Sequence, residues 1–466
     1  MKKSLALLIL AMGALPVAAQ TKYVVTDLGG LGGTFTSVNG INNTGQVVGS
    51  SNLPGDVITH AFRTAPNQPV KPGDDLGTLG GANSVGSAIN NTGQVAGRSD
   101  TADVGPFGST VSRAFRADPG LPMVGLGTLA PLGGVNGFNN SGANGINDAG
   151  RVAGFATVPF VCSSVSHAFL TSPNSPINPA FDNLGTLVSN CRSSTAFGVN
   201  SSGMTVGDSA TNVLTGVPNH AFRHTFLGGM VDLGTLGGRD SVAYAVNDLG
   251  EIVGQSQVPS DLVNNPFNSP HAFLSQGNVA MRDLGTLGGT YSSARAINRR
   301  SPLDSQIVGQ ASTAADAAFH AFLYTGNISA GTMVDLNGLI AASSGWELIG
   351  ATGINNKGQI VGTAWRNGVK FVNHAVRLDP SDVAVTNLVT SLSDPSLGLT
   401  IGQVSSLTDK LQNALASIQQ GLNQQAVNQL SAFISSVQTL QKNNKITNAT
   451  ANILIIAAQA IIAALS

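Results

Sequence analysis

Short stretches in which apolar and polar residues alternate recur along most of the chain, separated by turns rich in Asn and Gly. In the copy that covers residues 232–287, this alternation predicts strands at 241–247, 251–256, 271–276 and 279–287. The turn between the first two strands reads NDLG, and Asn and Gly accept the positive φ angles of tight hairpin turns. Each repeat is therefore predicted to form a four-stranded antiparallel sheet.

Three phrases mark seven such repeats. The phrase DLGTLGG begins at Asp27, Asp75, Asp232 and Asp283, and it persists in eroded form at Val124, Asp182 and Asp335. The phrase [IV]-N-x-x-G-x-[VI]-x-G has its asparagine at Asn42, Asn90, Asn147, Asn200, Asn247, Asn298 and Asn355. The phrase HAF begins at His60, His167, His220, His271 and His320, with Arg113 and His374 at the start of two variants. Seven copies at a period of about 50 residues predict the blades of a β-propeller.

The order of the phrases predicts a closed ring. The stretch KYVVTDLGG from Lys22 contains only a fourth strand, and the seventh repeat ends at HAVRLDPSD after only its third strand. The N-terminal strand would then complete the last blade and remove an exposed sheet edge, which an open solenoid would not require. We therefore predict an all-β seven-bladed propeller over residues 20–380, with the first strand of each repeat lining the central channel.

The repeated polar residues are predicted to be structural. Equivalent histidines of different blades are spread around a ring, too far apart to ligate one metal ion, so we expect each imidazole to bond a repeat Asp or a carbonyl. A single Asp per repeat lacks the ligand spacing of a calcium loop and indicates a turn or cap. A strand, rather than a helix, follows DLGTLGG, which argues against a phosphate-binding loop. The phenylalanine of HAF is expected between blades, and no cofactor is predicted.

After Pro380 the pattern changes to a helical period. Leu407, Leu411, Leu415 and Ile418 share one face, and Leu430, Phe433, Ile434 and Val437 share another. We predict a linker over 381–403 and a three-helix module over 404–466. The last helix, 449–466, is apolar enough to suggest a membrane span, but Asn452 and Gln459 interrupt it, and we expect it to pack against the other two. No transmembrane segment is therefore expected in the mature chain.

The N-terminal residues 1–19 resemble a signal peptide. Lys2 and Lys3 precede an apolar segment, and Val17 and Ala19 suit the positions before a cleavage site. A membrane anchor is the alternative, but the apolar segment is shorter than the roughly 20 residues that a bilayer requires. We expect a bacterial protein that is secreted, periplasmic or held at the cell surface.

Cysteine content and charge refine this picture. Cys162 and Cys191 are the two cysteines, and the predicted strand order places both on the same face of the disc in adjacent blades. A disulfide is expected there because an exported protein meets an oxidising environment, and two unpaired thiols are the alternative. The net charge of −1 and the absence of a basic cluster argue against nucleic-acid binding.

Catalytic constellations are scarce. The chain has two glutamates, of which Glu251 takes a position held by Gln in other repeats and is predicted to be a surface variant. Trp346 and Glu347, at the start of the seventh repeat, form a candidate ligand loop. We expect a non-catalytic protein that binds an extracellular glycan or protein through the variable loops between second and third strands. A propeller hydrolase or lyase acting on polysaccharide, and a purely structural envelope protein, are the alternatives.

The three phrases together resemble the HAF family of probable extracellular bacterial repeats over about residues 24–378. That resemblance implies an exported repeat protein and transfers no catalytic residue. Arg113 in place of His, Val376 in place of Phe and the eroded DLG phrases depart from the family pattern. The tail, with SAFISSV at 431–437, resembles the small helical module called FIMAH, which is found at the C-termini of secreted bacterial proteins.

Overall fold

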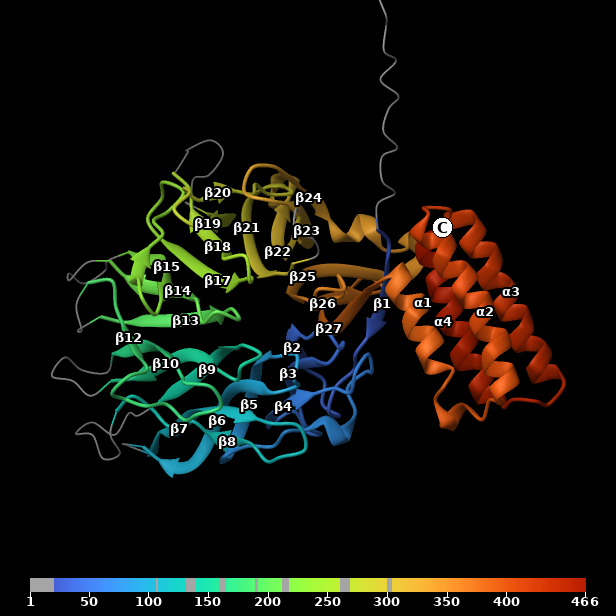
Figure 1. The fold of residues 1–466 in the computed structure, drawn as a ribbon, viewed down its shortest axis with the longest axis horizontal. Helices are drawn as coiled ribbons and strands as arrows, with labels where there is room; N and C mark the ends of the chain where they lie inside the picture. The colour runs from blue at the N-terminus through green and yellow to red at the C-terminus, as the bar shows by residue number, and fades with distance from the viewer. Residues whose placement is uncertain are drawn as a thin grey trace, which may run out of the picture.

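Seven antiparallel sheets are arranged in a ring, and a bundle of four helices lies beside it (Figure 1). The computed structural model describes residues 21–105, 108–130, 140–158, 165–188, 192–211, 218–259, 269–299 and 304–466. The predicted seven-bladed propeller is confirmed.

The sheets are called blades 1 to 7 in chain order, and their strands pair in sequence order. Blade 1 contains β2 (Thr36–Ile41), β3 (Val47–Asn52) and β4 (Thr59–Arg63); blade 2 contains β5 (Gly80–Ile89), β6 (Val95–Val104), β7 (Thr110–Ala117) and β8 (Val124–Gly125). Blade 3 contains β9 (Ser141–Ile146), β10 (Val152–Thr157), β11 (Ser166–Leu170) and β12 (Asn183–Gly185); blade 4 contains β13 (Ser194–Val199), β14 (Thr205–Ala210), β15 (Asn219–Thr225) and β16 (Gly229–Asp232). Blade 5 contains β17 (Ser241–Val246), β18 (Glu251–Gln257), β19 (Pro270–Gln276) and β20 (Arg282–Asp283); blade 6 contains β21 (Gly288–Ile297), β22 (Ser305–Thr313), β23 (Phe319–Gly326) and β24 (Gly331–Asp335). In blade 1 the fourth strand is reduced to one bridge, from Phe62 to Asp75.

Blade 7 closes the ring as the order of the phrases predicts. It contains β25 (Trp346–Ile354), β26 (Ile360–Arg366) and β27 (Val369–Pro380), and β1 (Tyr23–Asp27) pairs with β27 as its outermost strand. The register joins Tyr23 to Pro380 and Asp27 to Val376. The two ends of the propeller are therefore hydrogen-bonded into one sheet, and the last blade has no missing strand.

The phenylalanine of HAF packs between blades, as expected, for example Phe222 of blade 4 against Ala153 and Ala168 of blade 3. All six copies are fully buried: Phe62, Phe115, Phe169, Phe222, Phe273 and Phe322. The last glycine of the phrase [IV]-N-x-x-G-x-[VI]-x-G lies on the second strand of the blade and makes room for the phenylalanine ring. At Gly207 an added Cβ would meet the Thr195 carbonyl oxygen and, at 2.8 Å, Cε1 of Phe222. The repeated Gly and Phe therefore form one packing unit.

Replacing this glycine is expected to destabilise the propeller. Gly207→Ala forces a methyl group against strand β13 and the Phe222 ring, and we expect the free energy of unfolding to fall by about 3 kcal/mol. Urea unfolding followed by circular dichroism measures the change. Gly73→Ala is the matched control, because nothing lies within 4 Å of its added Cβ. Equal midpoints for the two variants would show that the Phe222 ring can move aside without cost.

A ring of seven asparagines lines one mouth of the channel. Each Nδ2–H donates to the backbone carbonyl of the repeat asparagine in the next blade, at 2.8–3.4 Å. The members are Asn42, Asn90, Asn147, Asn200, Asn247, Asn298 and Asn355, and Asn355 donates back to Asn42. Their Oδ1 atoms accept from backbone N–H groups of the turn that follows, such as Gln46. These asparagines therefore fix the tight turns and join neighbouring blades.

The repeat histidines bond the repeat aspartates. In blades 1, 4, 5, 6 and 7, Nδ1 lies 2.6–3.0 Å from a carboxylate oxygen, in the pairs His60–Asp75, His220–Asp232, His271–Asp283, His320–Asp335 and His374–Asp27. In blade 3, His167 bonds Asn183 instead. Blade 2 has Arg113 at the histidine position, and Gly125 pairs with Phe115 where other blades have the Asp. The His and the Asp are thus lost together in blade 2.

A repeated serine, which the sequence reading missed, joins successive blades. Its Oγ accepts the backbone N–H of the HAF alanine in the preceding blade at 2.7–2.9 Å, in the pairs Ala61–Ser84, Ala114–Ser141, Ala168–Ser194, Ala221–Ser241 and Ala272–Ser292. The same hydroxyl donates to the carbonyl of the DLG glycine, as Ser241 does to Gly234. The DLG phrase, the serine and HAF therefore form one joint between blades.

The expected linker is wrong, because the C-terminal module begins directly after the propeller. Helix α1 (Ser381–Ser391) precedes α2 (Ile401–Gln419), α3 (Asn423–Lys442) and α4 (Asn448–Leu465), so the module has four helices. Ala384, Val385 and Leu388 of α1 are buried in the core shared by all four. Their helical spacing was obscured by the polar residues of 381–403.

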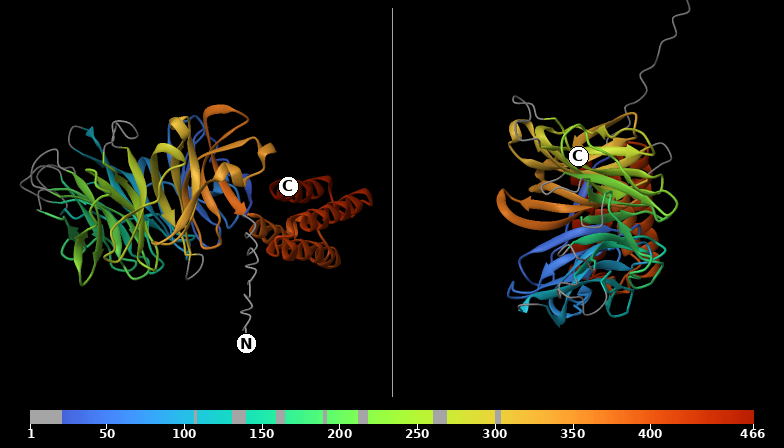
Figure 2. Two further views of the ribbon diagram at one scale, coloured as in Figure 1. Left: turned by 90° about the horizontal axis from the view of Figure 1, so that it is seen from above. Right: turned by 90° about the vertical axis from the view of Figure 1, so that its left-hand side faces the viewer.

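The bundle lies at the rim of the disc next to blade 7, as the edge-on view in Figure 2 shows. The backbone N–H of Ser381 donates to the carbonyl of Lys22, which joins α1 to β1. Helix α4 is long and apolar enough to cross a membrane by length and composition, and 39% of the candidate span is buried inside the protein. Leu454, Ala458 and Ile461 face the bundle core, whereas Ile456 is exposed.

Two sequence predictions lie outside the described residues. The expected signal peptide, 1–19, and the expected Cys162–Cys191 disulfide both fall there. Both remain predictions.

Candidate functional site

The innermost strand of every blade contains a bulge at the same position. In β17, Ala243 pairs with Gly254 and Ala245 with Val253, so Tyr244 between them has no partner on β18. The same shift leaves one residue unpaired in each of the other blades: Asn39, Ser87, Asn144, Phe197, Arg295 and Thr352. A bulge redirects the side chain of its extra residue, and here all seven line a pocket in the channel.

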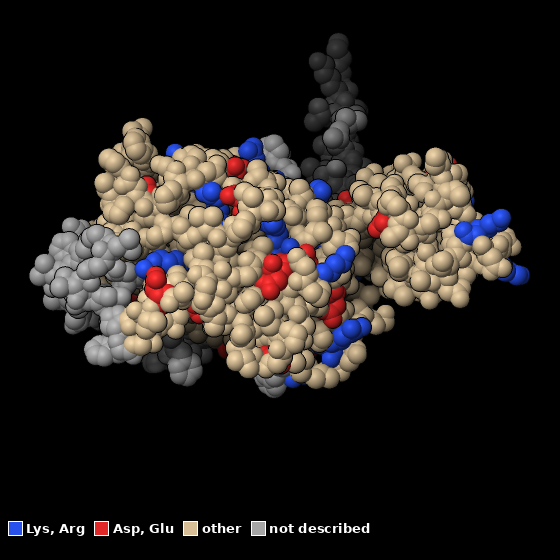
Figure 3. Space-filling model, turned by 90° about the horizontal axis from the view of Figure 1, so that it is seen from below, with Lys and Arg blue, Asp and Glu red and all other residues tan. Residues whose placement is uncertain are grey.

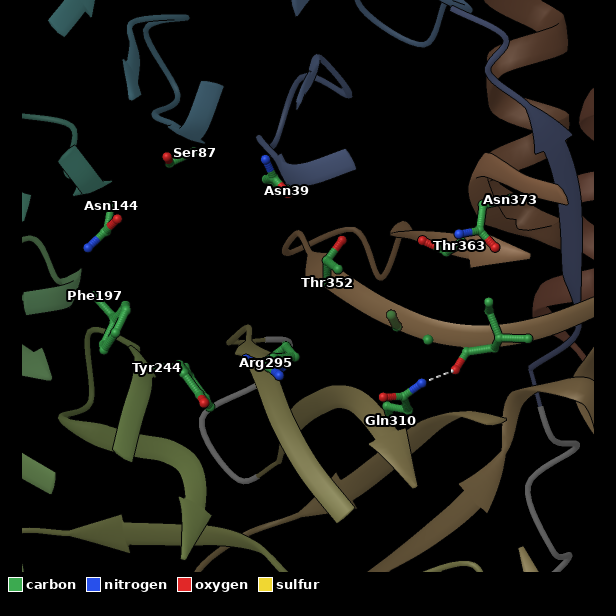
Figure 4. Close-up of a pocket in the computed structure, with 13 residues that line it drawn as sticks. Asn39, Ser87, Asn144, Phe197, Tyr244, Arg295, Gln310, Thr352, Thr363 and Asn373 are labelled. Carbon is green, nitrogen blue, oxygen red and sulfur yellow. Dashed lines mark hydrogen bonds between the residues drawn. The ribbon is translucent and has the colours of Figure 1, made fainter. Parts of the chain in front are cut away.

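This channel pocket has a volume of about 540 Å³, within the range of about 300–1,000 Å³ that is usual for small-molecule sites. Figure 4 shows the bulge residues around a common opening, with Gln310, Thr363 and Asn373 extending it beside blade 7. The asparagine ring surrounds a second hollow, at the opposite mouth. None of the described residues that line the channel pocket is an Asp or a Glu.

Three of the bulge residues have a role in the scaffold. Asn39 Nδ2 donates to the Gly86 carbonyl, and Asn144 Nδ2 donates to the Ala196 carbonyl, both at 2.8 Å. Thr352 Oγ1 donates to the Val38 carbonyl at 2.7 Å. In each case the acceptor belongs to the next blade, directly before its own bulge. A short polar side chain at this position therefore bridges adjacent inner strands.

Blades 4, 5 and 6 have large side chains in place of this bridge. The rings of Phe197 and Tyr244 meet edge to face with centroids 5.4 Å apart. The Arg295 guanidinium lies 4.3 Å from the centroid of the Tyr244 ring, within cation–π range. Figure 4 shows all three on one side of the opening. Because β-propeller closure does not require them, they distinguish this part of the channel from the rest.

The Tyr244 hydroxyl is neutral at the pocket, and the Arg295 guanidinium is the cation of the pocket. Burial raises the pKa of Tyr244, and the nearby Arg295 offsets part of that effect, so the hydroxyl remains protonated at neutral pH. Arg295 is exposed, and no carboxylate is among the described residues that line the pocket with it. The pocket thus presents aromatic faces, amides and one cation without a compensating anion.

One carboxyl, that of Asp208, interacts with Tyr244 without lining the pocket. Asp208 on β14 points to blade 5, on the same side of the strand as Val206, which packs against Ala243. Burial raises the pKa of Asp208 to about 6, and a hydrogen bond from Asn219 offsets part of that effect. Asp208 also interacts electrostatically with the Tyr244 phenol.

The candidate ligand loop of Trp346 and Glu347 is not a loop. Both residues begin strand β25, and neither lines the channel pocket. Trp346 packs edge to face on the imidazole of His374 with centroids 5.3 Å apart, and Arg366 covers it at 4.8 Å. Glu347 lies 3.9 Å from His320. These contacts give both residues structural neighbours at the boundary between blades 6 and 7.

Glu251 is also placed differently from the prediction. It is buried rather than at the surface, with 4% of its area exposed. Its carboxylate accepts hydrogen bonds from Asn247 Nδ2 and Ser305 Oγ. Glu251 therefore performs the turn-fixing role that Gln94 has in blade 2, where Asn90 donates to the Gln side chain. Sequence reasoning recognised the shared position but assigned it to the wrong environment.

Charge is sparse on the surface. Figure 3 shows one face of the molecule, on which the few acidic and basic side chains are interspersed and no sign dominates. Among the described residues, no group of three or more His, Cys, Asp or Glu side chains is placed to hold a metal ion. The loops between second and third strands in blades 3, 4 and 5 include 159–164, 212–217 and 260–268, which lie outside the described residues.

Comparisons with known proteins identify the helical module. Residues 398–463 match the FIMAH domain, which agrees with the resemblance seen in the tail. The match begins just before α2, so α1 lies outside it. No curated protein matches the chain.

Solved structures resemble the chain only distantly. A sucrose-6-phosphate hydrolase from Lactobacillus gasseri is 12% identical with a TM-score of 0.28, over 77% of this chain and 90% of the other. A structure from the GH130 family of mannoside phosphorylases, described as containing glycoside hydrolases that target β-1,2 mannosidic linkages in Candida mannan, is 11% identical with a TM-score of 0.25. That match covers 78% of this chain and 96% of the other. At these scores the likeness carries no argument about activity.

Proposed function

We propose that the chain is an exported, non-catalytic protein that binds an extracellular glycan in its channel pocket. The observation that carries this proposal is the run of Phe197, Tyr244 and Arg295 on consecutive blades. They occupy the bulge position, where other blades need only a short polar side chain. Three side chains that do not recur in the other repeats therefore lie together in the channel pocket of a repeated fold.

A saccharide suits this arrangement chemically. One face of a pyranose ring consists of C–H groups that pack on aromatic rings, whereas its hydroxyls need hydrogen-bond partners. Phe197 and Tyr244 supply the rings, and the side chains of Ser87, Gln310 and Asn373 supply polar groups around the same pocket. The pocket therefore offers both kinds of contact that a sugar requires.

Export is part of this proposal. It is supported by the signal-like pattern of residues 1–19 and by the resemblance of the repeats to the HAF family. The FIMAH match at 398–463 adds a second module beside the propeller.

A polysaccharide hydrolase is the second candidate, and Asp208 is the observation that favours it. A carboxyl with a pKa near 6 is protonated often enough at neutral pH to act as a general acid. Glycoside hydrolysis ordinarily needs a second carboxyl on the other side of the scissile bond. The described lining of the pocket supplies none, which favours binding over hydrolysis.

Immobilised polysaccharides test the proposal. We expect the mature chain to be retained on at least one member of a set of pectin, alginate, xylan and mannan, and to release no reducing sugar from it. Release of reducing ends that Asp208→Asn abolishes would replace binding by catalysis. Retention on none of the four, or retention that Tyr244→Ala leaves unaffected, would contradict a glycan site in the channel.

A further inference from the structure

We infer that the channel pocket selects acidic saccharides, with Arg295 binding the carboxylate of a uronate residue that stacks on Tyr244. This inference rests on the proposed glycan-binding function and names the class of ligand. It follows from the charge of the site: the described lining contains one guanidinium and no carboxylate.

The placement of Arg295 fixes the expected pose. The guanidinium lies 4.3 Å from the centroid of the Tyr244 ring, and Arg295 is one of the residues that line the pocket. A planar guanidinium binds a carboxylate through two parallel hydrogen bonds, and the pairing is strong because both partners are charged. A neutral sugar leaves this cation without an anionic partner.

Asp208 adds a dependence on pH. Tyr244 from β17 interacts electrostatically with Asp208, and Arg295 from β21 lies over that Tyr244 ring. β13 and β15 present the uncharged Thr195 and Asn219, and Asn219 also donates its backbone N–H to Asp240. Burial raises the pKa of Asp208 to about 6, so the group is neutral below that pH and negative above it. A uronate carboxyl, with a pKa near 3.5 as for an α-carboxyl, is ionised at either pH. Affinity for an acidic ligand should therefore fall as the pH rises through about 6.

The test is calorimetric titration of the mature chain with tetragalacturonate and, as the neutral counterpart of equal length, maltotetraose. We expect tetragalacturonate to bind at least tenfold more tightly, and about fivefold more tightly at pH 5 than at pH 7.5, because one nearby negative charge is removed. Arg295→Gln should abolish the preference and Arg295→Lys should retain part of it. Arg299→Gln, at the opposite mouth, is the matched control and should change neither affinity.

Each outcome bears on a separate claim. Equal affinities for the two ligands, or an acid preference that Arg295→Gln leaves intact, would overturn the inference while the proposed glycan binding stands. Binding of neither ligand, together with no retention on the four immobilised polysaccharides, would contradict the proposed function itself. Asp208→Asn should remove the pH dependence and keep the preference for acid; a pH dependence that persists in this variant would overturn the role of Asp208.

Discussion

A chain that begins at Leu28, and so lacks β1, is expected to lose its cooperative fold at a much lower temperature than the mature protein. β1 supplies the fourth strand of blade 7 and buries Tyr23, which is 1% exposed. Loss of a ring of this size from a core costs about 3–5 kcal/mol, and the unpaired edge of β27 would add to the cost. Thermal unfolding by circular dichroism and size-exclusion chromatography measure the effect.

Complementation separates ring closure from a general effect of truncation. A peptide with the sequence of residues 21–29 should restore the melting temperature when added in excess, because it can pair with β27 in the native register. A peptide with the same residues in scrambled order should not. A truncated chain that melts like the mature protein would show that the N-terminal strand does not close the ring.

Removal of both aromatic rings from the channel is expected to weaken glycan binding by about 30-fold, which corresponds to about 2 kcal/mol for two stacking contacts. The variant is Phe197→Ala with Tyr244→Ala, and calorimetric titration with the retained polysaccharide is the measurement. Because neither side chain forms the bridge that Asn39 and Asn144 form, the melting temperature should change little.

Phe226→Ala is the matched control for this pair. Phe226 is also an aromatic residue of blade 4, but it is 96% exposed between β15 and β16. Its removal should leave affinity unchanged. Equal losses for Phe226→Ala and the double variant, or no loss in the double variant, would place the ligand elsewhere on the molecule.

The fold was accessible from the sequence because its repeats make the same contacts in each blade. The repeat asparagine and the glycine of the second strand recur in all seven repeats, and the HAF phenylalanine recurs in six, always in the same order, so one copy predicts the others. Ring closure followed from the displaced DLG phrase at Asp27. The sequence pattern does not reveal the helix at 381–391, because its apolar residues, such as Val385 and Leu388, stand among Ser, Asp and Thr and are not confined to one face.

The candidate site was not accessible in the same way, because it consists of what the repeats do not share. A signal was nevertheless present: three residues before each repeat asparagine, one variable residue stands between two small or slender ones, as in Ala-Phe-Gly around Phe197 and Ala-Tyr-Ala around Tyr244. The alternation of side-chain directions along a regular strand would place this side chain on one face of the blade. Only the bulge directs it to the channel, and a bulge is a matter of register between strands that the sequence of one strand does not reveal.

The expectation of a loop at Trp346 and Glu347 is wrong for a related reason. Neither residue recurs at this position in the other repeats, and such a departure from the repeat suggests function. In the structure Trp346 covers the His374 imidazole and Glu347 approaches His320, so both support the joint between blades. A departure from the repeat can therefore be structural, and in blade 7 it is the bulge residue Thr352 that lines the pocket.

The central claim is that a ligand site has been added to a scaffold that does not need it, and converting the site back to scaffold tests this most directly. The triple variant Phe197→Asn, Tyr244→Asn and Arg295→Thr gives blades 4 to 6 the short polar residues found at Asn39, Asn144 and Thr352. We predict an unchanged or higher melting temperature, because new bridges between blades can form, together with loss of retention on every immobilised polysaccharide that the mature chain binds. Retention that persists in a folded triple variant, or collapse of the fold, would contradict the claim.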